Sequence, residues 1–379
     1  MLPRTIFSSE HEDFRNTVRR FIADEITPHQ ERWEEQQHVD REIWNRAGEL
    51  GMLCMTMPEE YGGFDADRLY PTILMEELAY AGDSGIGFPL HSDIVANYIN
   101  NFASDEQKVE WLPKMASGEW VTAIAMTEPG TGSDLQGIKT TAVEDGDDYI
   151  INGSKIFITN GYLCDMAIVA VKTGSDEKGA NNVSLIVIEA DRDGFTKGKP
   201  LKKVGMKAQD TCELFFKDVR VPKSNLIGQP GMGFIMLMKE LAWERMMIAI
   251  GSIAGAQAAY DMTVQYTKER KAFGRPIGAF QNTRFTLAEM KSEIAIGQVF
   301  VDRCIEQVLE NKLSVEAAAA AKYWTSDLLS KVIDQGVQLH GGYGFMLEYP
   351  IARAYCDHRA TRIFGGTNEI MKELISRAI

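Results

Sequence analysis

The chain has 379 residues, which is too many for one ordinary hydrophobic core, so two or three domains are expected. Hydrophobic residues make up 45% of it and charged residues 25%, the balance of a globular protein. The formal net charge of −14 argues against nucleic acid as a partner, because a phosphate backbone attracts clustered Lys and Arg.

The same composition bears on location and on metals. Apolar runs such as 248–250 and 317–321 are too short to span a bilayer, and residues 1–10 resemble neither a signal nor a transit peptide. The 5 cysteines form no Cys-x-x-Cys pair, and the 6 histidines lack the spacing of a zinc site. We therefore expect a cytoplasmic protein with reduced thiols, no metal and no membrane span.

Residues 1–121 have the pattern of helices. Apolar residues recur at helical spacing from Phe14 to Ile22, and further amphipathic stretches cover residues 41–50, 70–81 and 105–115. Loops rich in Gly and Pro separate these stretches. An N-terminal helical domain is therefore predicted for residues 1–121.

The pattern changes to short strands in residues 122–230. Runs rich in Val, Ile, Thr and Phe alternate with turn dipeptides such as Asn152-Gly153, and the runs cover residues 121–126, 149–151, 155–159, 167–171, 184–188 and 213–216. No helix-length segment lies between these strands. We therefore expect an antiparallel β-barrel or sandwich and not a parallel nucleotide-binding sheet.

Helical periodicity returns at Gly233 and continues to the C-terminus. Four long segments show it, at residues 233–269, 278–310, 314–339 and 367–378. Helices of this length usually form a bundle, which predicts a helical domain for residues 231–379. The whole chain is thus predicted to be an α+β multidomain protein.

Two segments of the strand region are candidates for binding a ligand. Residues 125–134 contain glycines that let a backbone approach a ligand, and Thr127 and Ser133 supply hydrogen-bond donors. Phe157 and Thr159 are two residues apart, so they are predicted to share a strand face that suits a planar heterocycle. Each pattern is more often an ordinary turn or edge strand.

Glu244 is the most informative single residue. It belongs to an apolar stripe whose members recur at steps of three or four: Phe234, Leu237, Leu241, Glu244 and Ile248. A carboxylate removed from water has a raised pKa and is a stronger proton acceptor than an exposed one. The spacing equally allows an ion pair with Arg245 or with a residue from elsewhere in the chain. Glu240, one turn earlier, is a rival base.

Three breaks in the C-terminal helical pattern are further candidates. Residues 270–281 lie between two long helices, where Arg270 and Arg275 suit a pyrophosphate. Residues 338–344 and 365–367 are rich in glycine, and Thr367 is the expected N-cap of the last helix. Exposed amides at a helix start can hold a polar ligand, although a connecting turn needs none.

Taken together, these segments resemble the acyl-CoA dehydrogenase family along essentially the whole chain. The segments that match in order and spacing are 125–134, 157–161, 270–281, 338–345 and 349–369. The resemblance implies an oxidoreductase of fatty acid β-oxidation and lipid metabolism. It implies N-terminal helices, a central β domain and a C-terminal four-helix bundle, usually assembled as a homotetramer.

The resemblance also implies FAD as cofactor and an acyl-CoA as substrate. FAD would lie between the β domain and the bundle and reach across a subunit interface. The implied cofactor contacts are Ile124, Met126, Thr127, Gly132, Ser133, Phe157, Thr159, Arg270, Phe273, Gln281, Gln338, Gly341, Gly342, Thr367 and Glu369. The implied substrate contacts are Ser133, Arg245, Gly365 and Gly366.

One position departs from the commonest family pattern. Many members carry the catalytic Glu just before Gly-Thr, where this chain has Gly365, and a glycine cannot take a proton. The long-chain and isovaleryl branches instead place the base in a Glu-Arg pair on a bundle helix, which Glu244-Arg245 matches. The resemblance therefore favours Glu244 over Glu240, and it favours the long-chain branch with a long or branched acyl group.

The implied reaction divides the work between protein and cofactor. Glu244 would take the α-proton while flavin N5 accepts the β-hydride, which leaves a trans-2-enoyl-CoA. The Gly365 N–H would help to hold the thioester carbonyl as the enolate forms. An electron-transfer flavoprotein would then accept the electrons. Two alternatives share this fold, an acyl-CoA oxidase that uses oxygen and a non-catalytic flavin-bearing protein that binds DNA or protein.

Overall fold

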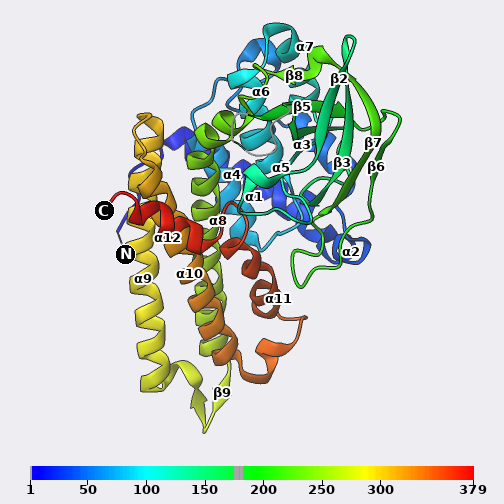
Figure 1. Cartoon of the computed structure of the whole chain (residues 1–379). Helices are drawn as coiled ribbons and strands as arrows, with labels where there is room; N and C mark the ends of the chain where they lie inside the picture. Colours follow the sequence, from blue (N-terminus) through cyan, green and yellow to red (C-terminus); the bar gives the residue numbers. More distant parts are fainter. Residues whose placement is uncertain (1, 175–178, 180–181) are drawn as a thin grey trace.

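Helices from both ends of the chain pack beside a β-sheet that the middle of the chain forms in the computed structural model (Figure 1), which describes residues 2–174, 179 and 182–379. The helices before the sheet are α1 (Ser9–Phe21), α2 (Gln30–Gln36), α3 (Glu42–Glu49), α4 (Leu69–Ala81), α5 (Phe88–Leu90), α6 (Ala96–Phe102) and α7 (Asp105–Ala116). The helices predicted at residues 41–50, 70–81 and 105–115 are confirmed as α3, α4 and α7.

The central sheet has 8 strands, in the order β6-β7-β3-β2-β4-β5-β8, with β1 paired to β4. The strands are β1 (Thr122–Ala125), β2 (Thr141–Asp145), β3 (Asp148–Ile158), β4 (Met166–Lys172), β5 (Val183–Glu189), β6 (Phe195–Lys197), β7 (Cys212–Pro222) and β8 (Leu226–Ile227). Met166, Ile168 and Ala170 of β4 face a core shared with helices, while Ala167 and Val169 face a core supplied by strands.

The predicted antiparallel barrel or sandwich is wrong in two respects. The sheet is open, because its edge strands β6 and β8 are not paired with each other, and β1 and β2 pair with β4 in parallel. Burial on both faces of the central strands produces the same sequence pattern in an open sheet as in a barrel. The turn expected at Asn152-Gly153 is instead a bulge inside β3, where Gly153 has φ +150°.

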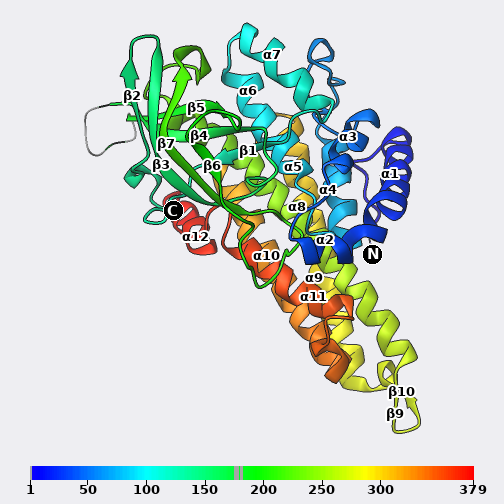
Figure 2. The same cartoon turned by 90° about the vertical axis from the view of Figure 1, so that its right-hand side faces the viewer.

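Long helices return after the sheet. They are α8 (Gly233–Glu269), α9 (Gln281–Leu309), α10 (Val315–His340), α11 (Pro350–Asp357) and α12 (Asn368–Ser376). The four helices predicted from periodicity correspond to α8, α9, α10 and α12. A short hairpin of β9 (Lys271–Ala272) and β10 (Arg275–Pro276) projects from the far end of α8 (Figure 2). None of the helices in the described ranges is long and apolar enough to cross a membrane.

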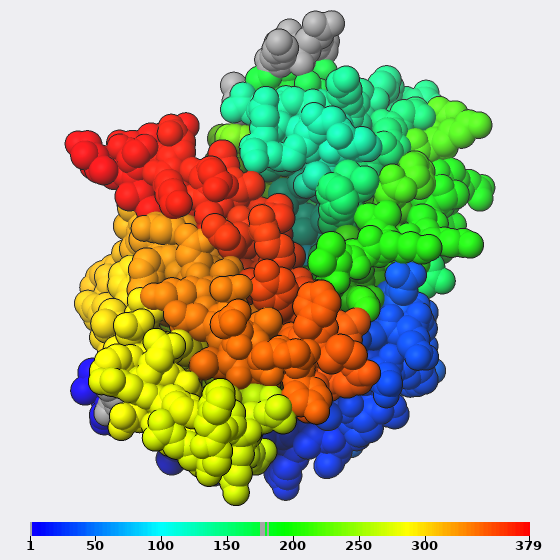
Figure 3. Space-filling model, turned by 90° about the horizontal axis from the view of Figure 1, so that it is seen from below, coloured from blue at the N-terminus to red at the C-terminus, as the bar shows by residue number. Residues whose placement is uncertain are grey.

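The first half of α8 lies where the three regions meet. Tyr98 of α6, Ile124 of β1 and Leu237 of α8 belong to one buried cluster. Further along α8, Met246 and Ile250 pack in a second cluster with residues of α9 and α10. Residues near the C-terminus (red) border the β-sheet (green), and the surface is hollowed where they meet (Figure 3).

Candidate active site

Glu244 is buried, as its place in the apolar stripe predicts. Its residue surface is 6% exposed, and the Tyr98 hydroxyl donates a hydrogen bond of 2.9 Å to its Oε1 atom. Burial raises the pKa of the Glu244 carboxyl from 4.5 to about 7, although the bond from Tyr98 acts in the opposite direction. A carboxyl with this pKa is partly ionised at neutral pH and accepts a proton readily once it is.

Neither competing interpretation of Glu244 gains support from the geometry. Among the described residues, Glu244 and Arg245 form no direct ion pair, and the buried Arg245 Nε atom has no hydrogen-bond partner. Burial also lowers the pKa of the Arg245 guanidinium. Its Nε atom is a buried donor without a partner, which costs free energy. The rival Glu240 is half-buried and accepts a hydrogen bond of 2.9 Å from Asn101.

Gly365 lies next to the same stretch of α8. A Cβ atom built on Gly365 would stand closer than 3.0 Å to Ile248 Cδ1, one helical turn beyond Glu244. Gly365 and Gly366 have φ values of +63° and +89°, which L side chains rarely adopt. Within the described parts of the chain the Gly365 N–H forms no hydrogen bond, so it is a free donor beside Ile248.

Lys322 of α10 holds this glycine turn and was missed by sequence reasoning. Its buried Nζ atom donates to the Gly366 carbonyl at 2.8 Å and to Asn368 Oδ1 at 2.9 Å. Burial lowers the pKa of Lys322 to about 8. Thr367 caps α12 as predicted, because its Oγ1 accepts the Ile370 N–H. The sequence feature that could have indicated Lys322 is its position directly after the run of alanines at residues 317–321.

The loop after β1 is fixed at its base by a buried ion pair that was also missed. Glu128 accepts hydrogen bonds from Lys155 Nζ at 2.9 Å and from the Thr140 N–H at 2.9 Å, and Lys155 also donates to the Met126 carbonyl. Lys155 is 0% exposed. The loop tip is open, since a Cβ at Gly132 would meet nothing within 4 Å.

The other predicted residues of this region occupy different surroundings. Ile124 is buried in β1, whereas Ser133 is exposed at the loop tip. Phe157 is 64% exposed with φ +62°, because β3 has an irregularity between Lys155 and Ile158. Thr159 lies in the turn after β3, so the prediction that Phe157 and Thr159 share a strand face is wrong.

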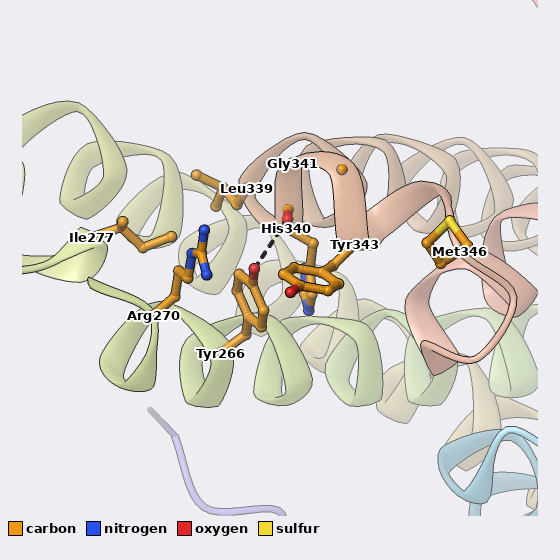
Figure 4. A pocket seen from close by; sticks show the side chains of 9 residues that line it. Tyr266, Arg270, Ile277, Leu339, His340, Gly341, Tyr343 and Met346 are labelled. Carbon is orange, nitrogen blue, oxygen red and sulfur yellow. Dashed lines mark hydrogen bonds between the residues drawn. The ribbon is translucent and has the colours of Figure 1, made fainter. Parts of the chain in front are cut away.

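A second set of predicted residues surrounds a pocket of about 580 Å³ at the far end of α8 (Figure 4). Arg270 lies 5.6 Å from the centre of the Tyr343 ring, and the Tyr266 hydroxyl donates to the His340 carbonyl at 3.1 Å. The residues that line the pocket are Tyr266, Arg270, Ile277, Leu339, His340, Gly341, Gly342, Tyr343 and Met346.

Three predicted cofactor contacts lie outside this lining. Phe273 is 95% exposed in the β9–β10 hairpin, and Gln281 and Gln338 are exposed at the start of α9 and near the end of α10. Glu369 lies in the first turn of α12, where hydrogen bonds from its own N–H and from Thr367 lower the pKa of its carboxyl.

Glu244 and the pocket beside Arg270 are far apart within one chain. Glu244 lies on α8, a single helix of 37 residues, and Arg270 directly follows the last residue of that helix. A rise of about 1.5 Å per residue separates Glu244 from Arg270 by roughly 40 Å. The pocket beside Arg270 therefore lies at the far end of the helix that carries Glu244.

Comparisons with known proteins agree along the whole chain. Family models described as the N-terminal, middle and C-terminal domains of acyl-CoA dehydrogenase match residues 8–119, 123–219 and 231–379. The chain is 48% identical over 377 residues to the long-chain specific acyl-CoA dehydrogenase, mitochondrial, of Sus scrofa, covering 99% of this chain and 88% of that protein.

Solved structures match equally well. A crystal structure of an acyl-CoA dehydrogenase from Geobacillus kaustophilus has a TM-score of 0.98 and 47% identity, with 99% of each chain covered. A structure of an acyl-CoA dehydrogenase from Bacillus anthracis, complexed with FAD, has a TM-score of 0.92 and 35% identity, and covers 98% of this chain and 67% of that one.

Proposed function

The chain belongs to the acyl-CoA dehydrogenase family, and we propose that it oxidises the α,β bond of acyl-CoA thioesters with Glu244 as the base. The observation that carries the assignment is the buried Glu244 carboxyl, one helical turn from the Gly365 turn. In this arrangement a proton acceptor and a free backbone N–H donor both adjoin the same stretch of α8, and abstraction of an α-proton needs both kinds of group.

FAD fits the residues that are present. The open tip of the 125–134 loop and the exposed Phe157 ring would hold its flavin end, and Gly341 and Gly342, which leave free space where a side chain would stand, would hold the adenosine diphosphate end beside Arg270. The separation of Glu244 and Arg270 along α8 supports the implied arrangement, in which one FAD contacts two subunits. When bound, FAD supplies the acceptor for the hydride that leaves the β-carbon.

The protein groups remove the α-proton and stabilise the charge that develops on the thioester. The Glu244 carboxylate takes the α-proton, and the electron pair of that C–H bond becomes the second bond between the α and β carbons. An α-proton of a thioester is too weakly acidic for an unassisted carboxylate, so the Gly365 N–H stabilises the negative charge on the thioester oxygen. Loss of the β-hydride completes the trans-2-enoyl-CoA. The buried surroundings of Glu244 keep water from competing.

Finer parts of the proposal rest on the family resemblance. We propose domains at residues 1–121, 122–230 and 231–379, with α8, α9, α10 and α12 as a four-helix bundle. The substrate would be a long-chain or branched acyl-CoA, and an electron-transfer flavoprotein would accept the electrons. A homotetramer and a cytoplasmic location stay predictions.

The test is anaerobic titration of the FAD-loaded enzyme with straight and branched acyl-CoAs, followed by flavin absorbance. Glu244→Gln should slow reduction by about 10²- to 10⁴-fold, the usual contribution of a general base. Glu240→Gln is the matched control on the same helix and should stay within a few-fold of wild type. Equal reduction rates in Glu244→Gln and wild type would refute the assignment, and rapid reoxidation by air would indicate an oxidase.

A further inference from the structure

We propose that Tyr98 is a positioning residue for Glu244, because its hydroxyl holds one carboxylate oxygen and stabilises the ionised form in which the base works. The inference rests on the proposed role of Glu244 in the reaction. It assigns a function to a side chain of the N-terminal helices whose hydroxyl forms no other hydrogen bond within the described residues.

The geometry brings together two residues that are 146 positions apart in the sequence. Tyr98 lies on α6 and is 0% exposed, and Glu244 lies on α8 and is 6% exposed. The Tyr98 ring is packed in the buried cluster where the three regions meet, so its hydroxyl has a fixed direction. A bond of 2.9 Å inside this cluster is shielded from water, which strengthens it.

The hydrogen bond uses only one oxygen of the carboxylate. Oε1 accepts the Tyr98 proton, while Oε2 has no hydrogen-bond partner in the described parts of the chain. The contact therefore fixes the rotamer of Glu244 and leaves one oxygen available for a substrate proton. Tyr98 cannot compete for that proton, because burial and the neighbouring Glu244 raise the pKa of its phenol well above the ordinary value.

Other charged groups around Glu244 do not replace this contact. Glu240, on the same helix, raises the pKa of Glu244, and Arg245 lowers it, in each case without a hydrogen bond to the carboxylate. Lys322 of α10 interacts with Arg245, and Arg68, which precedes α4, interacts with Glu240. Tyr98 is thus the group that lowers the pKa of Glu244 by direct hydrogen bonding.

Tyr98→Phe removes the hydroxyl and keeps the ring. Loss of a hydrogen bond to a charged group should raise the pH midpoint of substrate-dependent flavin reduction by about one to two units. At pH values below both midpoints the reduction rate should fall about 10- to 100-fold. At high pH it should return to the wild-type rate or exceed it, because the ionised base is then stronger.

A second readout does not depend on the reaction. The infrared band of the protonated Glu244 carboxyl, identified by its loss in Glu244→Gln, is titrated in the FAD-loaded enzyme without substrate. Its midpoint should rise in Tyr98→Phe by the same amount. Tyr98→3-fluorotyrosine keeps the packing and donates more strongly, so its midpoint should fall below that of wild type. This variant also tests the inference if Tyr98→Phe does not fold.

Tyr80→Phe is the matched control. Its hydroxyl also donates to a carboxylate on α8, at 3.0 Å from Asp261, but at an exposed site. Both midpoints should equal those of wild type. Wild-type midpoints in Tyr98→Phe and in the fluorotyrosine variant would overturn the inference while leaving Glu244 as the base. If the infrared midpoint shifts but Glu244→Gln is still reduced normally, the proposed function fails and the Tyr98–Glu244 coupling holds.

Discussion

The Ile248 side chain reaches into the space beside Gly365, so a side chain at residue 365 requires Ile248 to move. The Ile248 side chain occupies the position where a Cβ on Gly365 would stand, and the positive φ of Gly365 disfavours any other residue there. Ile248 follows Glu244 by one turn of α8, so the helix that carries the base also fills the room that a base at residue 365 would need. A base at residue 365 would therefore have to displace the Ile248 side chain.

Moving the base to the turn should therefore require a second change. In a Glu244→Gln background, Gly365→Glu should restore little flavin reduction, because Cβ collides with Ile248 and a non-glycine residue at positive φ costs about 1–2 kcal/mol. Adding Ile248→Ala should raise the reduction rate at least about tenfold, the equivalent of about 1.4 kcal/mol of released strain. Ile248→Ala alone is the control. Full activity of Gly365→Glu with Ile248 intact would contradict the steric argument.

The pKa of Glu244 also predicts how stability depends on pH. The carboxyl has a pKa of about 7 in the folded chain and 4.5 ordinarily, so between these values the folded state holds a proton that the unfolded state has lost. The free energy of unfolding should therefore fall as pH rises through this window. The full shift corresponds to about 3 kcal/mol.

A glutamine at position 244 does not titrate. As pH rises through this window, the free energy of unfolding of Glu244→Gln should therefore increase relative to that of wild type. Denaturant unfolding of both proteins, each loaded with FAD, measures the difference. A difference between Glu244→Gln and wild type that is independent of pH would show that folding does not raise the pKa of the Glu244 carboxyl.

Lys322 should matter for both stability and turnover. Lys322→Met leaves the Gly366 carbonyl and Asn368 without their buried donor, which should cost about 1–3 kcal/mol. The loosened turn should also misplace the Gly365 N–H and slow reduction. Lys331→Met, on the same helix, removes an exposed ion pair with Glu293 and should cost at most about 1 kcal/mol. Equal effects of the two variants would argue against a role for Lys322 in the turn.

The buried pair of Glu128 and Lys155 should be the most sensitive part of the loop after β1. Glu128→Gln or Lys155→Met leaves one unpaired buried charge and should cost about 3–5 kcal/mol. The double variant should be less destabilised than the sum of the two singles, because no charge remains unpaired. Chemical denaturation of all four proteins measures the coupling. Strict additivity would show that the two charges do not interact.

The features that could be predicted are those that depend on residues close together in the sequence. The long helices and the burial of Glu244 follow from spacing within a single helix, which the side chains themselves encode. Tyr98 and Lys322 had no comparable signal for their roles, because their partners lie on other helices and are brought near only by packing. The open edges of the sheet were not predictable either, since strand patterns record burial and not which strands pair.

The length of α8 has a genetic consequence. In the proposed oligomer each catalytic centre combines Glu244 of one subunit with Arg270 of another. Two chains that carry different inactivating substitutions can therefore form an active centre together. Cells that express Glu244→Gln and Arg270→Ala together would form mixed assemblies in which some centres contain both intact residues. Two alleles that are each inactive alone would then complement one another, and a dominant-negative effect of either would remain partial.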